Sequence, residues 1–342
     1  MVRSMSPAAA SKRVLRRLKI RGVGRYLPRR VVRNEELAPR LGLGADEIFE
    51  RCGVSERRRA SPQDERADWM AAQAAREALV DANLDPQALD LILNASATPL
   101  QALPDAAPFI QDALGLGRSG IATMSVGSAC LSFLSALDVA ASLLGTERYR
   151  HILLVSSEVS SIGLDSTDLE TAPLFGDAAA AVVVSLPDPD DPAALLGVRF
   201  ETYGHGAELT QIPGGGTRRP PGSPESHPSD NLFRMNGPAL LKLSARHARP
   251  FLRRLAEDAG PLDDALLIPH QPSRAGLKLM EMLGFSPART VSVLATLGNC
   301  VAASMPLALY DAIRSGRLAG GQRALLLGTG AGVSLGGALL EL

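Results

Sequence analysis

The chain has 342 residues, 46% of them hydrophobic, and 36 lysine and arginine residues balance 36 aspartate and glutamate residues. This is enough apolar material for one large core or two smaller ones, and the zero net charge lacks the basic excess typical of nucleic-acid binding. Three cysteines, at positions 52, 130 and 300, are too few and too scattered for a disulfide framework or a structural zinc site, which favours a reducing cytoplasm.

The first 18 residues are rich in alanine, serine and arginine and lack the apolar segment of a secretory signal. We interpret them as a mobile tail and expect the structured chain to begin near Lys19. No apolar run reaches the ~20 residues that a bilayer-spanning helix needs, so no membrane association is expected.

Apolar periodicity predicts strands and helices that alternate along the chain. Expected strands are 20–28, 89–95, 121–126, 151–156, 178–185, 265–268, 323–327 and 333–340, and expected helices are 67–83, 104–114, 238–259, 273–283 and 304–315, with others beginning at 34 and near 130. Pro104 suits the first turn of its helix. The glycine- and proline-rich stretch 204–231 is expected to be a long loop. Together these elements predict an α/β fold.

Cys130 is the strongest single candidate for chemistry. Small residues precede it, and Leu131, Leu134 and Leu137 then recur with the spacing of a buried helix. The thiol is therefore expected near a helix N-terminus, where free backbone N–H groups and the helix dipole should lower its pKa below the usual ~8.5. A thiolate there would be a nucleophile, although a cysteine that merely fills the core explains this stretch equally well.

Two polar residues in the second half could meet this thiol. His270 follows the expected strand 265–268, a position where α/β folds place reactive groups, although local backbone bonds could equally satisfy its ring. Asn299 precedes a helix and could donate a hydrogen bond into the site or simply cap the turn. The glycine-rich turn 328–332 lacks the lysine of a phosphate-binding loop, so it is a weak signal alone.

The chain also contains a weak internal repeat at about 170 residues. Segments 127–132 and 298–303 each open a helix, and a buried strand follows each helix. This similarity predicts two like halves packed together, with the two helix N-termini meeting around one site.

A series of short motifs, taken in order, resembles the β-ketoacyl-acyl-carrier-protein synthase III family of the thiolase superfamily. The resemblance runs from Lys19 to Leu342. The motifs are Gly24-Arg25-Tyr26-Leu27-Pro28, Gly53-Val54-Ser55-Glu56-Arg57, Ala97-Thr98-Pro99, Ser128-Ala129-Cys130, Phe175-Gly176-Asp177-Ala178-Ala179-Ala180, Met235-Asn236-Gly237, Pro269-His270-Gln271, Gly298-Asn299, Ala302-Ala303-Ser304-Met305-Pro306 and Gly330-Ala331-Gly332. It implies a thiolase-like, five-layered αβαβα fold, with halves 19–190 and 191–342, that usually forms a homodimer.

The resemblance implies a catalytic triad of Cys130, His270 and Asn299. Cys130 would take an acyl group from a thioester, with the oxyanion held by the N–H groups of Cys130 and Ala331. A second thioester, typically malonyl on an acyl carrier protein, would lose carbon dioxide and attack the acyl group, while a neutral His270 and Asn299 stabilise its enolate. No metal or cofactor is implied beyond acyl thioesters of coenzyme A or a carrier protein.

The implied substrate-binding positions include departures from the family. They are Leu103, Arg51, Arg274, Met235, Gly237 and Thr329. Relatives that use coenzyme A primers carry a Trp before the position of Arg51, which is missing here, and two expected basic positions hold Ile162 and Ala275. The acyl donor is therefore expected on a carrier protein or as an unusual thioester, the alternative being coenzyme A bound in a shifted pose.

Leu103 stands where the family reaches across the dimer interface into the partner's acyl pocket. It replaces the Phe common in primary fatty-acid enzymes, so a longer or branched acyl chain is expected. It also replaces the Glu base of a relative that condenses two fatty acyl chains, which argues against that mechanism.

The leading hypothesis is a Claisen-type condensing enzyme of polyketide or other specialised-metabolite biosynthesis. One alternative is an acyltransferase that moves the group from Cys130 to a hydroxyl or amine without forming a carbon–carbon bond. The other is a non-catalytic heterodimer partner, against which the complete triad argues.

Overall fold

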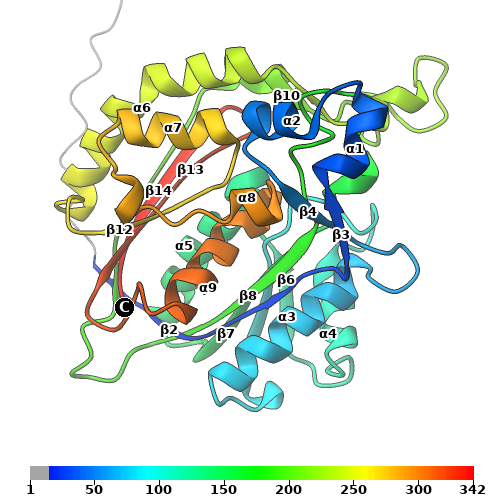
Figure 1. The fold of residues 1–342 in the computed structure, drawn as a ribbon. Coiled ribbons are helices and arrows are strands. Elements are labelled where there is room, and N and C mark those ends of the chain that lie inside the picture. Colours follow the sequence, from blue (N-terminus) through cyan, green and yellow to red (C-terminus); the bar gives the residue numbers. More distant parts are fainter. Residues whose placement is uncertain (1–14) are drawn as a thin grey trace, which may run out of the picture.

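Two five-stranded sheets, each built mainly from one half of the chain, carry the fold (Figure 1). The computed structural model describes residues 15–342. The first sheet has the order β2-β8-β7-β5-β6, and the second has the order β1-β9-β14-β13-β12. Their bounds are β2 (Lys19–Tyr26), β5 (Leu91–Asn94), β6 (Ala122–Ser125), β7 (His151–Glu158) and β8 (Ala178–Ser185), then β1 (Arg16–Arg17), β9 (Ala194–Thr202), β12 (Leu266–Pro269), β13 (Arg323–Gly330) and β14 (Ser334–Glu341).

Helices form three layers around the two sheets, as Figure 1 shows. The helices are α1 (Asn34–Leu41), α2 (Ala45–Cys52), α3 (Ala67–Asp81), α4 (Ala106–Ala113), α5 (Ser132–Leu144), α6 (Gly237–Ala259), α7 (Arg274–Met282), α8 (Leu294–Leu297) and α9 (Ser304–Arg314). Helices α5 and α9 lie between the sheets, α3 and α4 cover the outer face of the first, and α6 and α7 cover that of the second. The αβαβα layering expected from the resemblance is confirmed. The short pairs β3 (Arg30–Arg33) with β4 (Glu56–Arg59) and β10 (Thr210–Gln211) with β11 (Arg234–Met235) lie outside the two large sheets.

The core explains why these segments take these conformations. Strands β7 and β8 are buried along almost their whole length because helices cover both of their faces, and apolar residues form most of β8 and the centre of β7. From the central layer, Phe133 and Leu134 pack against residues of both sheets, and burial of each stabilises the fold by roughly 1.5–3 kcal/mol. On the outer face, Gly22 and Gly24 let α3 approach β2 closely, since a Cβ there would lie 2.3 Å and 2.2 Å from backbone oxygens of α3.

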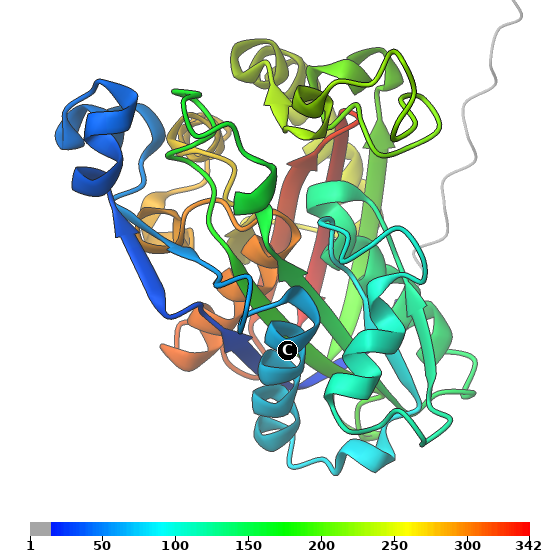
Figure 2. The same ribbon diagram turned by 90° about the vertical axis from the view of Figure 1, so that its right-hand side faces the viewer.

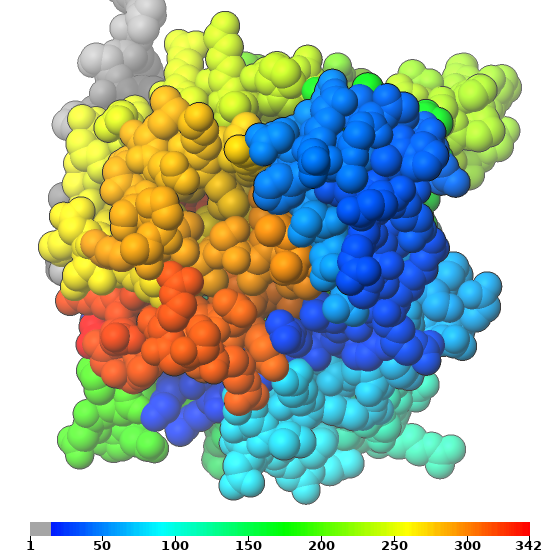
Figure 3. Space-filling model, in the orientation of Figure 1, coloured from blue at the N-terminus to red at the C-terminus, as the bar shows by residue number. Residues whose placement is uncertain are grey.

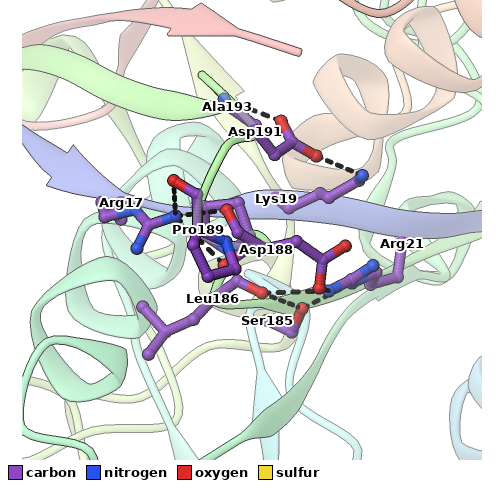
Figure 4. Close-up of polar contacts among 10 residues, drawn as sticks. Arg17, Lys19, Arg21, Ser185, Leu186, Asp188, Pro189, Asp191 and Ala193 are labelled. Carbon is purple, nitrogen blue, oxygen red and sulfur yellow. Dashed lines mark hydrogen bonds and ion pairs between the residues drawn. The ribbon is translucent and has the colours of Figure 1, made fainter.

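The structured chain begins earlier than Lys19, which corrects part of the expected tail; residues 1–14 lie outside the described region. Strand β1 pairs antiparallel with β9, and Leu18 is buried. Figure 4 shows Arg17 donating to backbone carbonyls at residues 187–189 while Lys19 pairs with the Asp191 carboxylate. These contacts with the β8–β9 connection are long-range, so the local composition gave no sign of them. The division at 190/191 stays a prediction.

Two further expectations need adjustment. The helix predicted over 104–114 begins at Ala106, because the Asp105 carboxylate accepts the Ala107 N–H at 2.9 Å and caps the helix there. The stretch 204–231 is largely irregular but includes two 3₁₀ turns, η4 (Gly204–Leu209) and η5 (Pro228–Asn231), besides strand β10. It lies beside the ends of β13 and β14 (Figure 2).

Candidate active site

Two similar turns face each other at the centre of the molecule. The 3₁₀ turn η2 (Ala129–Leu131) leads into α5, and η7 (Val301–Ala303) leads into α9, and the two turns pack together. In each, a residue that is not glycine has a positive φ, 49° at Ala129 and 48° at Val301, a strained conformation that tends to occur at functional sites. The prediction that the two helix N-termini meet is confirmed.

Side-chain hydroxyls hold the cysteine turn in place. Ser132 Oγ accepts the Ser128 N–H at 2.9 Å and donates to the Ala129 carbonyl at 2.7 Å. Cys130 lies between these anchors with its side chain partly exposed. The turn therefore presents the thiol at a fixed position ahead of α5.

The expected low pKa of Cys130 is wrong for this structure. Burial among protein atoms, and to a smaller extent the negative charge of Glu158, raise the thiol pKa to about 12. Hydrogen bonds from the backbone of Ala331 and of Cys130 itself oppose this shift without reversing it. The resting side chain is a thiol at neutral pH because desolvation outweighs the favourable end of the helix.

His270 lies directly after β12 and is buried. Its backbone N–H donates to the Leu327 carbonyl at 2.9 Å, and its Nδ1 has no hydrogen-bond partner among residues 15–342. Burial lowers the pKa of His270 to about 4, so the imidazole is neutral at physiological pH. Gly328 brings the segments together: a Cβ there would lie 2.8 Å from the Cβ of His270 and 3.1 Å from Leu131, the neighbour of Cys130.

Asn299 precedes η7, with its amide held in one orientation. Its Nδ2 donates to the Pro272 carbonyl at 3.1 Å and its Oδ1 accepts the Val301 N–H at 2.9 Å. The carboxamide carries two N–H groups, so one remains for a ligand. Since Pro272 follows His270 by two residues, this bond ties the asparagine turn to the histidine segment.

Glu158 is a residue of this centre that the sequence analysis missed. At the end of β7 it is fully buried, and its carboxylate accepts the N–H groups of Ala97 at 2.7 Å and Thr98 at 2.8 Å, and the Thr98 hydroxyl at 2.7 Å. The backbone of Ala302, in η7, also donates to it. Burial raises the pKa of Glu158 to about 7 despite these bonds. A polar residue just beyond the predicted strand 151–156 was the available signal, the same that identified His270.

Replacing Glu158 with glutamine should destabilise the protein by about 2–3 kcal/mol, because an NH₂ group would then face backbone N–H donors. The measurement is the free energy of unfolding from chemical denaturation. Glu225, an exposed loop residue, provides the control E225Q, which should shift the midpoint very little. Equal midpoints for E158Q and E225Q would contradict the assigned role.

A cavity of about 460 Å³ opens beside this centre, within the usual range for small-molecule sites. Four of the six predicted substrate-binding residues line it: Arg51, Met235, Gly237 and Thr329. Thr329 follows Gly328, and Pro272, which holds Asn299, also contributes to the wall. The cavity therefore borders the elements that carry His270 and Asn299.

The other predicted positions lie elsewhere. Arg274 is outside the lining and pairs with Glu50 of α2 at 2.5 Å, where α7 meets α2 (Figure 3). Leu103 and Ile162 are also outside it, with exposed fractions of 85% and 72%. Leu103 thus makes no wall of this cavity within one chain, whereas Ala275 does.

Comparison with known proteins agrees with this architecture. Residues 124–204 match the family described as 3-oxoacyl-acyl-carrier-protein synthase III, and residues 257–342 match its C-terminal region. The chain is 34% identical to beta-ketoacyl-acyl-carrier-protein synthase III of Aquifex aeolicus, over 94% of this chain and 99% of that protein. The enzyme of the same name from Methylococcus capsulatus is also 34% identical, over 94% of this chain and 98% of its own length.

Solved structures give the same result. The synthase III structure from Aquifex aeolicus is 33% identical, with a TM-score of 0.84 over 95% of this chain and 100% of that chain. A priming beta-ketosynthase of a polyketide pathway is 30% identical, with a TM-score of 0.83 over 97% of this chain and 98% of that chain. The chain belongs to the 3-oxoacyl-acyl-carrier-protein synthase III family of acyl-transferring condensing enzymes.

Proposed function

We propose that this protein carries an acyl group on Cys130 and joins it to a malonyl- or β-ketoacyl-type thioester by Claisen condensation. The convergence of three segments supports this: the η2 and η7 turns pack together, and Gly328 joins the His270 segment to the neighbour of Cys130. The order of these residue types in the chain matches the motifs of the family. The protein would need no metal or organic cofactor, since both reactants are thioesters.

In the first stage, the sulfur of Cys130 attacks the carbonyl carbon of the acyl thioester. The donor carbon–sulfur bond breaks, and the donor thiol leaves with the proton that Cys130 loses. The N–H groups of Cys130 and Ala331 would hold the oxyanion. The hydrogen bond from the backbone of Ala331 toward the thiol supports this assignment, because that N–H already points to the reacting region.

In the second stage, the extender thioester loses carbon dioxide and the resulting enolate carbon attacks the acyl carbonyl. The carbon–sulfur bond to Cys130 then breaks, and the released thiolate takes up a proton from solvent to restore the thiol. His270 and Asn299 would donate to the extender carbonyl as negative charge develops on it. A neutral imidazole suits this role, and the low pKa of His270 keeps it neutral.

An acyl carrier protein is the proposed macromolecular partner. The relatives carry this protein in their names, and helix α6 offers a basic face beside the cavity. Its exposed cations Lys242, Arg246, Arg249 and Arg253 follow one another at intervals of four, three and four residues, so they share one face. Leu241 and Ser244 of the same helix line the cavity. An acidic carrier could dock on this face and extend its thioester arm inward.

A homodimer is proposed from the free edge of the first sheet. Within residues 15–342, strand β6 pairs only with β5, Met124 on it is 38% exposed, and Leu103 in the loop before α4 is 85% exposed. A second copy pairing at this edge would cover both residues. Sedimentation analysis should give twice the chain mass of 35.9 kDa, and a single-chain mass at micromolar concentration would count against the dimer.

The assignment to specialised-metabolite biosynthesis remains a proposal, supported by the similarity to the polyketide priming ketosynthase and by Ala275, an altered position that lines the cavity. The test is an intact-mass screen of acyl-coenzyme A and acyl-carrier donors of graded chain length. The acylated protein is then mixed with a malonyl thioester labelled in its free carboxyl group. Release of labelled carbon dioxide with a β-ketoacyl product is expected. Formation of an ester or amide without carbon dioxide would favour the alternative acyltransferase.

Among helices of residues 15–342, none combines the length and apolar character required to cross a membrane.

A further inference from the structure

The charged residues at the cavity mouth leave a carboxylate, rather than a cation, without an ion-pair partner. Arg51 and Glu170 are the only charged residues in the lining found within the described part of the chain. Arg51 donates to the Glu47 carboxylate of its own helix at 2.8 Å, and nearby Arg274 is engaged by Glu50. Both cations near the mouth are thus paired with carboxylates.

Glu170 has no cation partner of this kind. No ion pair to its carboxylate is found in residues 15–342, and the residue is exposed to solvent. Its carboxylate stands over the first turn of α6, since a Cβ on Gly237 would lie 3.2 Å from Oε2. Leu169, which precedes Glu170 in the chain, and Ala275 also line the cavity and are apolar. Among the residues described, the lining therefore presents one carboxylate without a cation partner and no unpaired cation, and the exposed cations of α6 lie outside it.

We infer that Glu170 selects the acyl donor by excluding polyanionic thioesters while admitting an uncharged pantetheine arm. This rests on the proposed acylation of Cys130. Coenzyme A brings its pyrophosphate and ribose phosphate to the cavity mouth when its thioester reaches inward, and Glu170 repels them there. The arm of a carrier protein has the same length but brings only a single phosphodiester to this point, so Glu170 repels it much less than the three phosphates of coenzyme A. The donor class is therefore a carrier-bound acyl thioester.

The experiment compares Glu170→Gln with the wild type, using one acyl chain on coenzyme A and on pantetheine. Intact-mass kinetics give the second-order rate of Cys130 acylation for each donor at low and high salt. Glutamine keeps the size and polarity of Glu170 while removing its charge. The exposed Glu225→Gln variant is the matched control, with the same charge change far along the chain.

At low salt, E170Q should raise the rate with acyl-coenzyme A about five- to tenfold, since one repulsive interaction with several phosphates is lost. High salt should largely abolish this difference by screening. The rate with acyl-pantetheine should not change, and E225Q should behave as the wild type.

An unchanged ratio of the two rates in E170Q would overturn the inference, as would a gain that persists at high salt. A loss confined to acyl-pantetheine would also overturn it, because it would mark Glu170 as a hydrogen-bond acceptor for the arm. Acylation of the wild type by neither donor would instead refute the proposed function, and the inference with it.

Discussion

Replacing Cys130 with alanine should abolish covalent acylation and reduce condensation at least ~10³-fold. The sulfur is the proposed attachment point of the acyl group, and alanine offers no nucleophile. The variant should remain folded, because the turn is held by Ser132 rather than by the thiol. Intact mass after incubation with an acyl thioester measures the adduct directly.

Cys300 provides the matched control, since it lies beside the equivalent turn η7. It is buried, and burial raises its pKa strongly. The variant C300A should therefore acquire the acyl adduct at nearly the wild-type rate. A C130A protein that still gains the adduct, or a C300A protein that loses it while folded, would remove the nucleophile assignment.

Replacing His270 with alanine should lower the decarboxylation rate about 10²- to 10³-fold and affect acylation much less. The reason is that the imidazole is proposed to stabilise the enolate of the second thioester rather than the first oxyanion. Asn299→Ala should likewise lower the decarboxylation rate much more than the acylation rate. The measurement separates the rate of Cys130 adduct formation from the release of carbon dioxide.

The exposed His205 in the 204–231 stretch supplies the control H205A, which should leave both rates unchanged. Equal losses of acylation and decarboxylation in H270A would show that the imidazole acts in the first stage too. Full retention of decarboxylation would contradict the role proposed for it.

The same histidine should contribute to the pH dependence of stability. Its pKa is about 4 in the folded protein and ~6.5 in the unfolded chain, so the unfolded state binds more protons between these values. Folding stability should thus fall by up to about 3 kcal/mol as the pH drops through this window.

Glu158 should affect stability in the opposite direction. Its pKa of about 7 in the folded protein exceeds the ordinary 4.5, so stability should fall as the pH rises from 4.5 to 7. In H270A, denaturation curves at graded pH should lose the His270 contribution and keep that of Glu158.

The sequence by itself determined the order of the elements and the position of the reactive candidates. Local signals carried this information: apolar periodicity placed β7, β8 and α5, and polar residues at strand ends marked His270. The spacing of small residues around Cys130 also indicated the turn before a helix. The joint order of short motifs identified the family and hence the five layers.

Only the tertiary structure decided the electrostatics of the site. The pKa of Cys130 depends on desolvation and on Glu158, which meets the turn through the fold rather than through the sequence. The pairing of Arg274 with Glu50 likewise joins residues that are 224 positions apart. Arg274 was predicted to bind substrate, but its positive charge is paired with this carboxylate. Short-range patterns fix which segments are helices and strands. Burial and charge are properties of the contacts between those segments, and they appear only when the segments are packed.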